Sequence, residues 1–131
     1  MIPRGTRYRL AQEIEYPLLD DLIKEEPRLQ VHGYAFPTIV AEREDTGEIV
    51  GFISTNPRKD MILCEPIIAP NGIVYMRLIE AYQKVVYAGG IRSVFIRVHE
   101  DLDKHLRVAK KVPIFEPLDV INGFHWFVRR M

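Results

Sequence analysis

A strand, a long helix and a second strand follow one another between residues 60 and 100, and this order constrains the fold more than any other feature. The apolar run DMILCEPIIAP leads through a Pro-Asn-Gly turn into a segment whose apolar residues recur at helical spacing. Gly89 and Gly90 stop the helix, and IRSVFIRVHE then predicts a strand buried on both faces. A right-handed crossover makes the two strands parallel neighbours. Pro66 interrupts the first strand, so we expect the pair to diverge there.

The rest of the chain predicts further strands and two more helices. An alternating stretch at 6–13 predicts a first strand, and two β-branched runs flank Asp45-Thr46-Gly47-Glu48, a composition typical of a hairpin turn. Residues 100–112 predict a helix, and the segments 114–118 and 123–131 predict closing strands. A helix over 15–26 ends near Pro27 and presents one apolar face, formed by Leu18, Leu19, Leu22 and Ile23.

Composition limits the classes of protein to which the chain can belong. Its 131 residues, 47% of them hydrophobic, suit a single domain over 1–131. The 18 Lys and Arg residues balance the 18 Asp and Glu residues, so no overall field attracts nucleic acid or an anionic membrane. Cys64 is the only cysteine, which suits a reducing compartment. There is no apolar signal core at the start and no run of the roughly 18 apolar residues that a membrane helix needs, so we expect a soluble, cytoplasmic protein.

The order of the elements and the sequence Ile68-Ala69-Pro70 resemble the GNAT family of acyl-CoA-dependent N-acyltransferases, whose corresponding strand ends in V-x-P. The resemblance covers most of the chain. It implies an α+β fold in which helices flank a mixed, mostly antiparallel sheet of six to seven strands. It also implies a splay between the central parallel strands, where the family seats the pantetheine arm of its coenzyme.

The resemblance further implies a site for acetyl-CoA on the main chain of this strand and of the turn after it. The implied cofactor-binding residues are Ile67, Ile68, Ala69, Asn71, Gly72, Ile73, Val74 and Tyr75. In the family, the amides of an R/Q-x-x-G-x-G/A turn bind the pyrophosphate of coenzyme A. Here Ile73 and Tyr75 stand where the family has glycines, and the loop is shorter. A helix start with Asn-Gly can hold an anion on its free amides, but it can equally be a simple corner.

Glu65 is the candidate catalytic base, because it lies on the strand that would present the thioester. An apolar surrounding would suit a carboxylate in this role, whereas a solvated or salt-bridged strand carboxylate is the alternative. Many members of the family have a tyrosine on the last helix that protonates the leaving thiolate. The corresponding helix has no tyrosine here; His105 is either a substitute donor or simply a half-exposed helix residue.

Other reactive residues carry weaker indications of function. Cys64 has no Lys, Arg or His beside it and reads as a small buried residue. The four histidines lack metal-ligand spacing, so we predict no metal. Trp126 and Phe127 either pack the final strand or contribute to a homodimer contact. A basic face on the last helix is either solvated or meets a coenzyme phosphate or nucleic acid; it is formed by Lys104, Arg107, Lys110 and Lys111.

Two functions follow from the resemblance. One is an N-acetyltransferase that transfers the acetyl group of acetyl-CoA to an amine, either a small molecule or a protein. The alternative is a catalytically inactive GNAT-fold module that binds another protein or macromolecule, in which Tyr75 fills the turn after Pro70. Nucleic-acid binding is a weaker third option, given the zero net charge. The acceptor side is expected at 27–37, where Tyr34 and Phe36 either line a pocket or pack.

Overall fold

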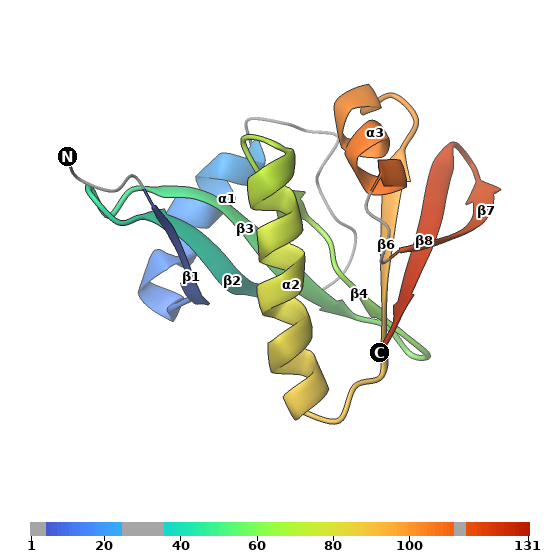
Figure 1. The fold of residues 1–131 in the computed structure, drawn as a ribbon, viewed down its shortest axis with the longest axis horizontal. Coiled ribbons are helices and arrows are strands. Elements are labelled where there is room, and N and C mark those ends of the chain that lie inside the picture. The colour runs from blue at the N-terminus through green and yellow to red at the C-terminus, as the bar shows by residue number, and fades with distance from the viewer. Residues whose placement is uncertain (1–4, 25–35, 112–114) are drawn as a thin grey trace.

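The computed structural model describes residues 5–24, 36–111 and 115–131. Its strands and helices follow one another in the order that the sequence predicts (Figure 1). In chain order they are β1 (Thr6–Leu10), η1 (Glu13–Glu15), α1 (Tyr16–Lys24), β2 (Phe36–Arg43), β3 (Ile49–Pro57), β4 (Ile62–Leu63), β5 (Ile67–Ile68), α2 (Gly72–Ala88), β6 (Ser93–His99), α3 (Asp103–Lys111), β7 (Glu116–Ile121) and β8 (Phe124–Arg130).

The described strands form one mixed sheet of eight strands in the order β1-β2-β3-β4-β6-β8-β7, with β5 paired to β3 beside this path. β4 and β6 pair in parallel at Leu63 and Phe95, and the other pairs are antiparallel. This confirms the predicted α+β fold with a mixed, mostly antiparallel sheet. The strand number exceeds the predicted six or seven because the strand that contains Pro66 is divided into β4 and β5.

The hairpin between β2 and β3 is confirmed. Its turn closes through hydrogen bonds from the amide of Arg43 to the carbonyl of Glu48, and from the amide of Gly47 to the carbonyl of Arg43, each 2.8 Å long. Gly47 has a φ of 75°, a left-handed conformation that glycine adopts without steric cost. The Asp-Thr-Gly-Glu composition therefore specified both the position of the turn and its backbone geometry.

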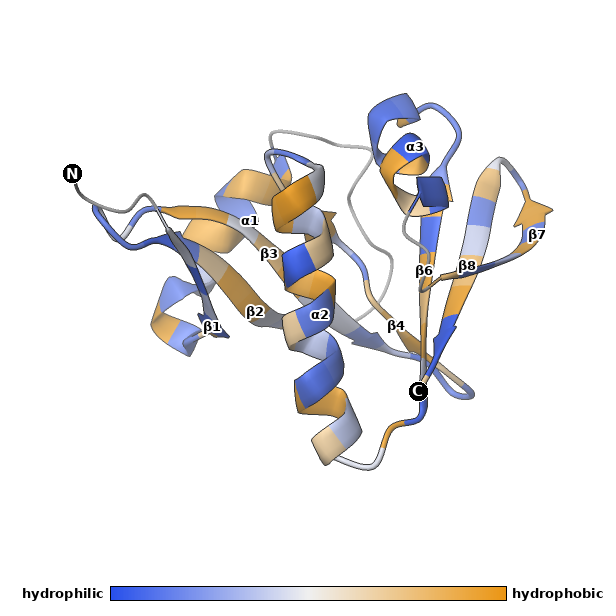
Figure 2. Cartoon of the chain, in the orientation of Figure 1, coloured by the Kyte–Doolittle hydropathy of each residue, from blue (hydrophilic) through white to orange (hydrophobic). Residues whose placement is uncertain are grey.

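Helices cover both faces of the sheet: α2 crosses one face and α1 lies behind the other (Figure 1). Side chains alternate along β2 and β3, so Ile39 and Ile53 join the core under α2, whereas Val40 and Phe52 pack with Leu19 of α1. Hydrophobic colouring is found along β2 and β3, and α2 carries alternating hydrophobic and hydrophilic bands (Figure 2). The two helices thus pack on the half of the sheet to which β5 belongs.

The apolar face of α1 is narrower than the sequence predicts. Leu19 is fully buried, and Leu22 and Ile23 pack against its cluster, but the side chain of Leu18 is 52% exposed. Neighbouring helical positions are rotated by about 100° from each other, and the contact with β2 and β3 is too narrow to cover both leucines. The predicted helix end at Pro27 lies outside the described residues, as does Tyr34.

The central strands diverge at the predicted place. The amide of Cys64 donates a hydrogen bond of 2.8 Å to the carbonyl of Phe95, and beyond this point the chain pairs with β3 instead of β6. The next peptide bond, between Glu65 and Pro66, is cis. The sheet therefore separates between β5 and the second half of β6, on the side where α3 lies (Figure 1).

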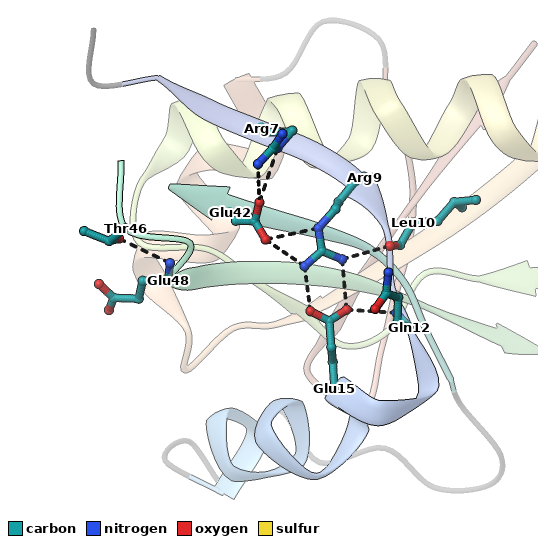
Figure 3. Close-up of polar contacts among 8 residues, drawn as sticks. All are labelled: Arg7, Arg9, Leu10, Gln12, Glu15, Glu42, Thr46 and Glu48. Atoms are coloured by element: carbon teal, nitrogen blue, oxygen red, sulfur yellow. Dashed lines mark hydrogen bonds and ion pairs between the residues drawn. The ribbon is translucent and has the colours of Figure 1, made fainter. Parts of the chain in front are cut away.

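Away from this separation, Arg9 joins β1 to β2 and to the turn that leads into α1 (Figure 3). Its guanidinium donates to Glu15 over 2.6 and 2.9 Å and to Glu42 over 2.8 and 3.1 Å. Arg7 donates to Glu42 from the same side. Hydrogen bonds from Arg9 lower the pKa of both carboxyl groups below the ordinary value of 4.5.

This cluster predicts acid-dependent unfolding. Because the folded-state pKa values of Glu15 and Glu42 lie below their unfolded values, their contribution to stability is fully present above about pH 4.5 and is lost as the pH falls through the folded values. We expect urea unfolding between pH 7 and 3 to show a shallower pH dependence in Arg9→Gln than in the parent. Arg92→Gln is the control, since Arg92 donates only to backbone carbonyls in the recorded contacts. If stability depends on pH as steeply in Arg9→Gln as in the parent, the attribution of this dependence to the Arg9 cluster is wrong.

Candidate active site

A small inner cavity of about 30 Å³ lies where β5 and β6 separate. Residues from four parts of the chain meet there: the β4–β5 link, α2, the β6–α3 segment and the start of β8. The lining consists of Cys64, Glu65, Pro66, Ile67, Tyr75, Arg97, Val98, His99, Leu102, His105 and Phe124. The predicted base Glu65 and the predicted thiolate donor His105 therefore line the same cavity.

Glu65 is held by an arginine that sequence reasoning missed. Nε of Arg97 donates to Oε2 of Glu65 over 2.6 Å, and Nη2 donates to Oε1 over 3.1 Å. The two side chains are 14% and 15% exposed, so the pair lies inside the cleft. The surrounding of Glu65 is therefore ionic and not apolar, so the salt-bridged carboxylate named as the alternative is the one that the structure has. The pairing instead fixes the orientation of the carboxylate.

Aromatic rings from β8 hold the guanidinium in place. The antiparallel register places Trp126 opposite Arg97 and Phe124 opposite His99. The guanidinium carbon of Arg97 lies 4.7 Å from the centre of the Phe124 ring and 5.5 Å from that of Trp126. His99 meets Phe124 edge to face at 4.9 Å between ring centres. Trp126 thus contributes to the surroundings of the site as well as to strand packing.

A second, outer cavity of about 390 Å³ lies beside the turn that starts α2. Tyr75 and His105 line both cavities, so the two cavities are neighbours. Its lining comes from the turn and from α3, and consists of Ala69, Pro70, Asn71, Gly72, Tyr75, Lys104, His105, Arg107 and Val108. Two of the four residues of the predicted basic face, Lys104 and Arg107, therefore stand opposite the turn.

The start of α2 is partly capped by its own residues. The side-chain oxygen of Asn71 accepts from the amide of Val74 over 2.9 Å, and the carbonyl of Asn71 accepts from the amide of Tyr75 over 3.1 Å. These two amides are therefore engaged within the helix. Of the amides predicted to contact an anion in this turn, those of Gly72 and Ile73 therefore remain as candidates. They lie at the positive end of the helix dipole.

Along β5, the backbone N–H and C=O groups of successive residues point alternately toward β3 and away from it. The amide of Ser54 donates to the carbonyl of Pro66, which makes Phe52 and Ile68 the next hydrogen-bonded pair. The N–H and C=O of Ile67 and Ala69 then point away from β3, as the predicted coenzyme contacts require. Ile68 faces β3 instead: its carbonyl lies only 2.4 Å from the position of a Cβ atom at Gly51. The backbone of Ile68 therefore does not point toward the place where the coenzyme contact is predicted.

Tyr75 does not fill the turn. Its side chain is 4% exposed and belongs to the core under the sheet, next to Cys64. Burial raises the pKa of Tyr75, and burial raises the pKa of Cys64 to about 12. Cys64 is 3% exposed, which agrees with its reading as a small buried residue. The ring of Tyr75 thus forms the wall between the two cavities, and the turn itself opens into the outer one.

The protein thus has an α+β fold, with two neighbouring cavities where the sheet separates. Solved structures with the same architecture are GNAT acetyltransferases. PaiA N-acetyltransferase from Thermoplasma acidophilum, in complex with coenzyme A, has a TM-score of 0.75 at 10% identity, covering 97% of this chain and 99% of that one. NAA60 from Arabidopsis thaliana, in complex with acetyl-CoA, has a TM-score of 0.71 at 15% identity, with the same coverage of 97% and 99%.

A probable acetyltransferase from Staphylococcus epidermidis is similar over 97% of this chain and 99% of its own, with a TM-score of 0.70 at 14% identity. No family model and no curated protein sequence matches this chain. The chain has the GNAT fold, as the sequence predicts. Within the described ranges, none of the helices has the length and apolar character needed to span a membrane.

Proposed function

We propose that the protein is an acyl-CoA-dependent N-acetyltransferase that transfers the acetyl group of acetyl-CoA to an amine. The observation that carries this proposal is the pair of adjacent cavities, one beside the start of α2 and the other at the Glu65 carboxylate. The outer cavity offers cations and helix amides, and the inner cavity offers a carboxylate and a histidine. A nucleotide thioester needs the first set of groups, and amine acylation needs the second.

The coenzyme would lie along the outer cavity. The amides of Gly72 and Ile73 suit the pyrophosphate, and Lys104 and Arg107 supply positive charge opposite them. The outward main-chain groups of Ile67 and Ala69 suit the amides of the pantetheine arm, which would add to β5 in the manner of a strand. The residues present therefore fit acetyl-CoA, although the turn lacks the glycines of the family motif.

The reaction would take place at the inner cavity. Glu65 accepts a proton from the acceptor ammonium, and the freed nitrogen lone pair attacks the thioester carbonyl carbon. The carbon–sulfur bond then breaks, the nitrogen gives up its second proton to form the amide, and the thiolate takes a proton from His105. The proton from the nitrogen replaces the one that His105 donates, and Glu65 releases its own proton to solvent. Both residues line the cavity where the two substrates would meet. Arg97 acts as a positioning residue, because it fixes the carboxylate through two hydrogen bonds.

The alternative function is a GNAT-fold module without catalysis that binds another macromolecule. That alternative requires a closed turn filled by Tyr75. The open outer cavity and the buried Tyr75 ring favour the enzyme instead.

Coenzyme binding is tested by thermal unfolding in the presence of CoA, acetyl-CoA and pantetheine. A ligand at about 100 times its dissociation constant stabilises the folded state by about 2.7 kcal/mol. We expect CoA and acetyl-CoA to raise the melting temperature, and pantetheine, which lacks the phosphates, to raise it less. A melting temperature unchanged by millimolar CoA would contradict the proposed function.

A further inference from the structure

The Glu65–Arg97 pair leaves hydrogen-bonding capacity on each charged group, and both residues line the inner cavity. We infer that this pair selects an acceptor amine that carries a carboxylate on the neighbouring carbon, as an α-amino acid does. The inference rests on the proposed function and adds the substrate class. An amino acid zwitterion complements the pair, because its ammonium faces Glu65 while its carboxylate faces Arg97.

The guanidinium of Arg97 retains donors for such a carboxylate. A guanidinium has five N–H groups, and Glu65 engages Nε and one side of Nη2. Among the described residues, no hydrogen bond to Nη1 is recorded. The end of the group formed by Nη1 and Nη2 therefore remains available, in the geometry that binds a carboxylate through two parallel hydrogen bonds. The rings of Phe124 and Trp126 keep the plane of the guanidinium fixed.

Glu65 retains acceptor capacity for the ammonium. An ionised carboxylate offers about four lone-pair sites, and Arg97 uses one on each oxygen. The substrate ammonium can bind Oε1 while its own carboxylate binds the neighbouring Nη2. The four charged groups then alternate in sign around a closed ring. A simple amine could occupy only the Glu65 side and would leave the donors of Arg97 without a partner.

Cavity size and charge favour this acceptor over a polyamine. The inner cavity is small, about 30 Å³, so recognition must act on atoms close to the nitrogen. Glu65 is the only acidic residue in the described lining, and Arg97 balances its charge. The site therefore has no excess negative field with which to attract a polycation.

The test is an acetyl-transfer assay on the unmodified protein with common α-amino acids, their amides and the corresponding decarboxylated amines. We expect kcat/KM for the best amino acid to exceed that of its amide by about 10- to 100-fold, as hydrogen bonds between charged groups imply. The amide loses its ammonium proton more easily, so chemistry alone would favour it. Equal or faster acetylation of amides or amines would overturn the inference. No transfer to any acceptor, with no stabilisation by CoA, would instead overturn the proposed function.

Substitutions of Arg97 test whether the Glu65–Arg97 pair causes the preference for amino acids over their amides. In Arg97→Gln we expect kcat/KM for the amino acid to fall to the level of the amide, while the preference persists in part in Arg97→Lys. The control is Arg130→Gln, which removes a surface arginine from its pair with Glu116 and leaves the preference unchanged. An Arg97→Gln protein that keeps the full preference would overturn the assignment. If that variant does not fold, the acceptor series on the parent protein still decides the question.

Discussion

Glu65→Gln is expected to lower kcat by about 10²- to 10⁴-fold, the usual contribution of a positioned general base. Glutamine keeps the shape of the side chain and a carbonyl oxygen for Arg97, but it cannot accept the ammonium proton. Coenzyme binding should be retained, because the groups assigned to the phosphates lie in the other cavity. The measurement is steady-state turnover at saturating acetyl-CoA, together with the dissociation constant of CoA.

A matched control separates lost chemistry from lost stability. Glu116→Gln alters a second glutamate–arginine pair, at an exposed end of β7 and β8, where both side chains are about 60% exposed. Turnover in this variant should equal that of the parent. Parent-like turnover in Glu65→Gln would remove Glu65 from the mechanism, and a loss of CoA binding would show that the substitution disturbs the whole cleft.

Gly72→Asp is expected to abolish most of the coenzyme affinity while preserving the fold. A Cβ atom at this position would lie 3.6 and 3.8 Å from the methyl groups of Val108, which is ordinary contact. A carboxylate in the first turn also favours the helix by about 0.3–1 kcal/mol. The same charge opposes the pyrophosphate. Two unit charges about 5 Å apart, at an effective dielectric constant of about 20, repel by about 3 kcal/mol, or roughly a hundredfold in affinity.

Gly72→Asn is the control for size, because it adds a side chain of the same shape without the charge. We expect calorimetry to give a much weaker dissociation constant for CoA in Gly72→Asp than in Gly72→Asn, and melting temperatures without ligand that differ little. Equal affinities in the two variants would mean that no phosphate lies beside the start of α2.

The sequence contains enough local information to predict the hairpin and the splay. The Asp-Thr-Gly-Glu turn lies between two β-branched runs, so its chemistry and the patterns around it agree. Pro66 removes a backbone donor from a strand that would otherwise pair on both sides, and the observed separation begins just before it, after Cys64. The order of strand, helix and strand then restricts the connection to a single handedness.

The partner of Glu65 could not be predicted from the sequence. Arg97 is 32 residues away along the chain, and the two meet because Leu63 pairs in parallel with Phe95. A shift of this register by one residue would turn the arginine to the other face of the sheet. The register depends on tertiary packing, which single-sequence patterns do not specify. For the same reason, the contributions of Phe124 and Trp126 became clear only with the pairing of β6 and β8.

The central claim, that acetyl-CoA lies between β5 and β6 with its phosphates at the start of α2, is tested most directly by NMR. The measurement is a titration of the ¹⁵N-labelled protein with CoA, followed through the backbone amide signals. We predict that the amides of Ile67, Gly72 and Ile73 shift together and saturate at one coenzyme per chain, while the amide of Ile68, which faces β3, moves less. Absence of shifts at Ile67, Gly72 and Ile73 under millimolar CoA would contradict the claim.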